Sequence, residues 1–112
     1  MEDMIKNIDP KTVLELDEMI QYQPGQVVSR TLAQNKALSL TLFAFDRGEE
    51  ISSHSSGGDA MVYIMDGGAQ VTIGDQTYYL DKGKTIVMPA GVPHALFASE
   101  RFKMLLIVVF PS

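Results

Sequence analysis

The 112-residue chain contains no cysteine, which excludes disulfide bonds, thiolate metal sites and a cysteine nucleophile. Its longest apolar run, residues 104–110, is about a third of a membrane span. The first residues lack the basic start and apolar segment of a secretory signal, so we expect a cytoplasmic protein. Basic residues are also few: 9 Lys and Arg against 14 Asp and Glu give a net charge of −5. This balance argues against nucleic-acid and membrane partners.

Alternating apolar and polar residues are the main fold signal, and an apolar share of 46% is sufficient for a globular core. Gly67-Gly68 is expected to end one strand, and Gly74-Asp75 to form a tight turn. Short strands at roughly ten-residue spacing predict an all-β sandwich or barrel. The candidate strands are residues 26–30, 38–42, 60–65, 70–73, 77–80, 85–88, 94–99 and 102–110.

The N-terminal stretch has two interpretations. Asp9-Pro10 can open a helix, and Thr12 and Glu15 have the spacing of a capping box. Three apolar residues would share one helical face: Val13, Leu16 and Ile20. The same residues would also suit a peripheral strand, so the sequence predicts either a short helix or an extra strand.

Only two histidines occur, and each follows a turn-rich segment. Their surroundings resemble the two motifs of the cupin superfamily, specifically its small single-domain members. The first motif is matched by Gly48, His54 and Gly67, and the second by Gly83, Pro89, Gly91 and His94. The resemblance implies a double-stranded β-helix (jelly-roll) barrel over residues 26–110. With an N-terminal arm, residues 1–25, this makes a single cupin domain, residues 1–112.

The resemblance also implies a metal-ligand set, of which this chain has half. His54 and His94 stand at two ligand positions, whereas Ser56 replaces the second histidine of the first motif and Ala60 replaces its glutamate. The asparagine of the second motif is replaced by Ala98. Two imidazoles alone can hold a divalent transition metal such as Zn, Ni, Cu, Mn or Fe. The alternative is a metal-free polar pair at the barrel mouth, titrating near pH 6.5 when unperturbed.

The phase of the strands predicts a largely apolar cavity behind the two histidines. Its expected lining is His54, Ser56, Ala60, Val62, His94, Leu96 and Ala98. Such a cavity suits an apolar or aromatic small molecule, although the same residues would equally fill a small barrel's core.

Three functions follow from these observations. The preferred one is a small cupin that binds a small molecule, or a divalent metal, around His54 and His94. The first alternative is a metal-dependent enzyme of the isomerase, decarboxylase or dioxygenase type, so whether the protein is an enzyme stays open. The second is a structural or partner-binding barrel without a ligand. A homodimer is expected, partly from the resemblance and partly from the apolar last strand, residues 104–110.

Overall fold

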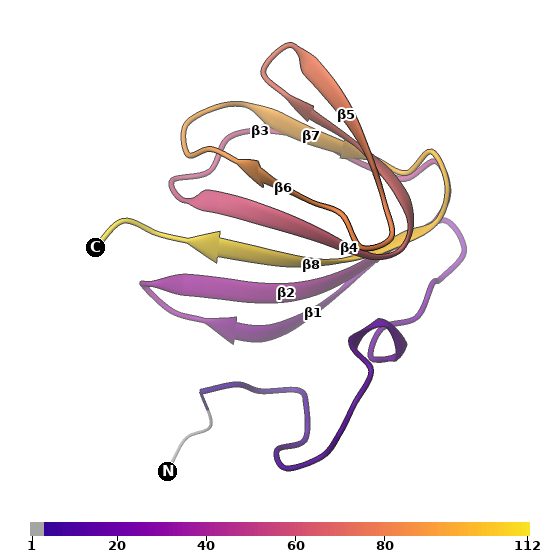
Figure 1. Ribbon diagram of the computed structural model, residues 1–112, viewed down its shortest axis with the longest axis vertical. Coiled ribbons are helices and arrows are strands. Elements are labelled where there is room, and N and C mark those ends of the chain that lie inside the picture. The colour runs from indigo at the N-terminus through magenta and orange to yellow at the C-terminus, as the bar shows by residue number, and fades with distance from the viewer. Residues whose placement is uncertain (1–3) are drawn as a thin grey trace.

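The computed structural model describes residues 4–112, which form eight strands and a single turn of 3-10 helix (Figure 1). Every strand pairing is antiparallel. The strands are β1 (Val27–Gln34), β2 (Leu38–Phe45), β3 (Glu50–His54), β4 (Asp59–Ile73), β5 (Gln76–Asp81), β6 (Thr85–Met88), β7 (His94–Phe97) and β8 (Phe102–Val109).

Strand β4 belongs to both halves of a curled sheet, as its long curved band in Figure 1 shows. Its first half joins sheet A, in the order β1-β2-β8-β4-β6, and its second half joins sheet B, in the order β5-β4-β7-β3. The two sheets fold toward one another around an apolar core. This arrangement confirms the predicted all-β jelly-roll barrel.

The prediction that Gly67-Gly68 ends a strand is wrong, because β4 continues through both glycines. Gly67 has φ +71°, and a Cβ there would collide with the carbonyl of Arg101. A shift of register between Ile64 and Asp66 lies just before it. The glycines therefore let β4 bend from sheet A into sheet B without leaving the hydrogen-bonded ladder.

The two faces of β2 contact different apolar clusters. Phe45 is fully buried inside the barrel, stacked on Phe102 with ring centroids 4.3 Å apart. Leu42 and Ala44 point to the opposite face and are equally buried, because the N-terminal arm covers them. The chain thus has one core between the sheets and a second core between sheet A and the arm.

Within the described residues, the N-terminal arm contains neither a regular α-helix nor a strand. Its only regular element is the 3-10 turn Leu16–Glu18, and no strand forms before β1 within the described residues. The predicted helical face does not form: Val13 is fully exposed, whereas Ile20 is buried. The Thr12 hydroxyl donates to the carbonyl of Pro10 instead of capping a helix. Within residues 4–112, no helix is long and apolar enough to cross a membrane.

Tyr22 fastens the arm to β4 beside its bend. Its hydroxyl donates a 2.6 Å hydrogen bond to the carboxylate of Asp66 on β4. The cationic groups of Arg101 and Lys103 lie 5.2 and 5.0 Å from its ring centroid. Burial and the Asp66 carboxylate raise the pKa of the Tyr22 phenol, so the residue stays a neutral donor.

Candidate functional site

The two histidines meet at the end of the barrel opposite the β4 bend. His54 is the last residue of β3 and His94 is the first of β7, and they are directly paired in register. Their ring centroids lie 4.4 Å apart in a nearly perpendicular arrangement. The structure therefore brings together the two residues that the sequence singled out.

A β-bulge is responsible for this pairing. Ile51 lies opposite Leu96 and His54 opposite His94, so two residues of β3 stand against one residue of β7. Strict alternation from the inward-facing Ile51 would turn His54 toward the outer surface. The extra residue shifts the phase and turns the imidazole of His54 to the face that carries His94. The carbonyl of Ser52, within the bulge, lies 3.0 Å from His54 Nδ1 and fixes the ring.

The two imidazoles have different surroundings. His94 is only 4% exposed, and the described residues offer its Nδ1 no hydrogen-bond partner. His54 is exposed. Burial, and then the positive charge that His54 can carry, lower the pKa of His94 below its usual value. His94 is therefore a neutral imidazole at pH 7, with one nitrogen able to donate and the other able to accept.

Ser56 differs from the other residues that were predicted to line the cavity. It lies in the loop between β3 and β4, and its hydroxyl is engaged within its own turn. Its Oγ accepts from the amide of Gly58 at 3.1 Å and lies 3.2 Å from the carbonyl of the same residue. The remaining four share the inner face of the sheets and are packed in the barrel core: Ala60, Val62, Leu96 and Ala98.

Two hydroxyl groups on the inner face of sheet A are not among the residues predicted to line the cavity. Ser39 is paired with the core residue Val108, and Thr41 with Leu106, which packs against the core. Residues directly opposite in a ladder share a face, so Ser39 and Thr41 face inward. The pattern that could have identified these hydroxyl groups is the alternation of residues 38–42, in which the leucines face outward and the polar residues face the barrel interior.

The loops around this end are tied together and enclose a shallow hollow. The amide of Gly91 donates to the carbonyl of Ser56 at 2.9 Å, and the amide of Ala90 to the carboxylate of Asp59 at 2.8 Å. A hollow of about 350 Å³ lies between these loops and residues 109–111, and neither histidine lines it.

The four-ligand metal site that the resemblance implies does not fit these residues. Within residues 4–112 no group of three or more His, Asp or Glu side chains is placed to hold a metal. The serine and alanine at the other two ligand positions are turned into their own loop and into the apolar core. The candidate site is a pair of imidazoles at the end of sheet B.

Comparison with known proteins agrees with this architecture. The family model described as Cupin domain matches residues 41–110. A conserved protein of unknown function from Streptococcus pyogenes is 50% identical with a TM-score of 0.97, covering 99% of this chain and 97% of that one. A cupin superfamily protein from Desulfitobacterium hafniense is 34% identical with a TM-score of 0.91, covering 96% and 98%.

A more distant similarity shows the fold alone. A salicylate 1,2-dioxygenase from Pseudaminobacter salicylatoxidans is 20% identical with a TM-score of 0.68, and the match covers 78% of this chain and 27% of that one. The family match spans more than half of the sequence and includes every strand except β1 and the start of β2. This chain belongs to the cupin domain family.

Proposed function

We propose that this cupin binds a small organic molecule at the mouth of the barrel, with His54 and His94 as its main hydrogen-bonding groups. The bulge in β3 carries the proposal, because it turns His54 from the outer surface to the side of His94. Bulges are frequent next to active and binding sites, where they aim a side chain. A barrel that was only structural would gain nothing from the second imidazole at this position.

The surroundings define the class of ligand. Leu96 lies on the same face of β7 as His94 and is apolar, and the inner face of sheet A carries Val62 together with the hydroxyl groups of Ser39 and Thr41. Small-molecule sites usually combine apolar walls with a few convergent polar groups. The ligand is therefore a molecule with an apolar or aromatic body and one or two groups that hydrogen-bond a neutral imidazole.

Thermal unfolding with a panel of ligands tests the proposal, because a ligand that binds only the folded state raises Tm. The panel contains aromatic acids, phenols and aliphatic alcohols, with Zn, Ni, Cu, Mn and Fe salts as a separate arm. His54→Ala and His94→Leu remove the two imidazoles, and Tyr79→Phe is a control on the outer surface.

The expected result is an organic compound that stabilises the wild type and Tyr79→Phe but neither histidine variant. Equal stabilisation of all four proteins, or no stabilisation by any organic compound, contradicts the proposal. Stabilisation by a metal salt alone, lost in both histidine variants, would replace the organic ligand with a cation held by two imidazoles.

A further inference from the structure

A second hollow lies between the N-terminal arm and the barrel. Its volume is about 440 Å³, within the range of small-molecule sites. Three side chains of the arm and three of the barrel line it: Glu15, Leu16, Asp17, Tyr63, Met65 and Lys82. We call it the arm hollow. Neither histidine of the barrel mouth lines it, so a ligand bound here would occupy a site separate from that of the proposed function.

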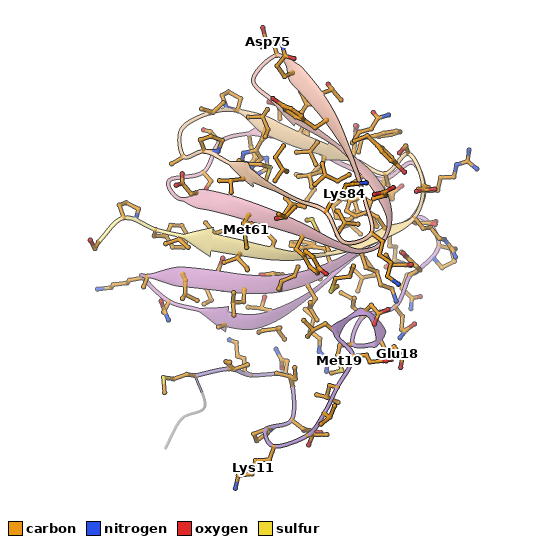
Figure 2. The ribbon with its side chains drawn as sticks, in the orientation of Figure 1. Lys11, Glu18, Met19, Met61, Asp75 and Lys84 are labelled. Carbon is orange, nitrogen blue, oxygen red and sulfur yellow. The ribbon has the colours of Figure 1, made fainter. Side chains whose placement is uncertain are left out.

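Hydrogen bonds hold both walls of the arm hollow in place. The ammonium of Lys103 on β8 donates to the carbonyl of Asp17 at 2.6 Å and fixes the 3-10 turn of the arm. Figure 2 shows this turn, labelled at Glu18, and it lies against β4. On the barrel side, the amide of Gly83 donates to the carbonyl of Ile64 at 2.8 Å and ties the loop between β5 and β6 to β4. The walls are therefore fixed by the fold itself, as in most small-molecule sites.

The charged groups of the arm hollow are not paired with one another. Within residues 4–112, neither the Glu15 nor the Asp17 carboxylate lies within ion-pair distance of the Lys82 ammonium. Glu15 precedes the 3-10 turn, and its side chain does not cap it. Lys84 in the same loop, by contrast, is bonded to Asp81 at 2.6 Å. Opposite charges thus line one space without neutralising each other.

The rest of the lining is apolar or aromatic. Met65 is only 6% exposed, and Leu16 packs against the cluster to which Met65 belongs. Tyr63 is 41% exposed, so a large part of its side chain is available to a ligand. Such a surface favours an apolar group, because covering it removes apolar area from water.

We propose that the arm hollow binds a free amino acid with an apolar side chain. The α-ammonium group pairs with Glu15 and Asp17, the α-carboxylate pairs with Lys82, and the side chain packs on Tyr63 and Met65. Hydrogen bonds between such oppositely charged groups are the stronger ones in proteins. A simple amine would leave Lys82 unpaired. A simple carboxylate would leave the two acidic groups unpaired and would be repelled by a chain of net charge −5.

Isothermal titration calorimetry at pH 7 with L-leucine, L-methionine and L-phenylalanine tests this proposal. Isoamylamine and isocaproate are leucine without its carboxylate and without its ammonium group, respectively. Lys82→Met and Asp17→Asn should each weaken binding of the amino acid about tenfold, because each removes one charged partner. Lys84→Met is the matched control, since Lys84 lies in the same loop but is bonded to Asp81 and does not line the hollow. Circular dichroism checks that all variants are folded.

At least one of the three amino acids should bind the wild type, Lys84→Met and His54→Ala with the same affinity. Isoamylamine and isocaproate should both bind more weakly than leucine. No binding of any of the three amino acids at millimolar concentration overturns the proposal, and so does unchanged affinity in Lys82→Met and Asp17→Asn. Equal binding of isoamylamine and leucine would make the hollow a site for organic cations and overturn the assignment of a zwitterion. Loss of binding only in His54→Ala would place the amino acid at the barrel mouth and likewise overturn it.

Discussion

Lowering the pH from 7.5 to 5.5 should destabilise the protein through His94. Burial and the neighbouring His54 lower the pKa of His94 in the folded state, whereas the unfolded chain has the ordinary value of about 6.5. Below pH 6.5 the unfolded state therefore binds more protons than the folded state. Stability from this group is complete above the unfolded pKa and declines as the pH falls toward the lowered pKa of the folded protein.

The titration of His94 involves a single proton, which limits how much stability the protein can lose. A single group changes the free energy of unfolding by at most about 1.4 kcal/mol per pH unit, so the loss by pH 5.5 is up to about 1.4 kcal/mol. For a domain of this length that corresponds to a fall in Tm of about 5 °C. The pKa of Asp46 is lowered by hydrogen bonds from the Gly25 amide and Arg101, and that of Asp81 by Lys84. Stability from these carboxylates is present above their unfolded pKa and is lost only at more acidic pH.

Urea unfolding at four pH values between 7.5 and 5.5 measures this effect. The chain has no tryptophan, so far-UV circular dichroism is the suitable signal. His94→Leu should flatten the pH dependence, and His54→Ala should reduce it in part, because burial of His94 persists. The same slope in the wild type and in His94→Leu would refute the reasoning, as would a wild type that becomes more stable on acidification.

Three further substitutions test the fold and the site. Gly67→Ala should lower the free energy of unfolding, measured with urea, by at least about 2 kcal/mol. Gly83→Ala should cost less. Both glycines have positive φ, but only at Gly67 would a Cβ collide with a backbone carbonyl. Tyr22→Phe should cost about 1–2 kcal/mol, since it removes the 2.6 Å hydrogen bond to the carboxylate on β4; an unchanged Tm would show that the arm is held by packing alone. Ser56→His with Ala60→Glu should raise nickel affinity at least tenfold by calorimetry, and no gain would show that the assigned motif positions are wrong.

Local patterns predict most of the strands and the two histidines of the candidate site. Alternation located the strands that line the barrel, because a buried face imposes a period of two. The prediction that Gly67-Gly68 ends a strand is wrong, because glycine suits both a bend within a strand ladder and a break between two strands. The sequence of β3 resembles a turn-rich segment, because its short serine-containing stretch becomes a strand by pairing with β7. The expected helical face of the arm does not form, because the conformation of the arm depends on the outer face of sheet A, which is distant in sequence.

The first half of β2 has an unusual distribution of polar and apolar residues. Its polar residues, Ser39 and Thr41, face the barrel interior, and its leucines face outward. A barrel with only an apolar core and a solvent-exposed surface would have the opposite arrangement. An inward hydroxyl is useful when the interior receives a polar group, whereas the outward Leu40 packs against the cluster between sheet A and the arm. Ser39→Val should therefore weaken binding of the organic ligand, measured by the rise in Tm, whereas Leu40→Thr should leave ligand binding unchanged. If Leu40→Thr weakened ligand binding as much as Ser39→Val does, or if Ser39→Val had no effect on it, the assignment of Ser39 to the ligand site would be wrong.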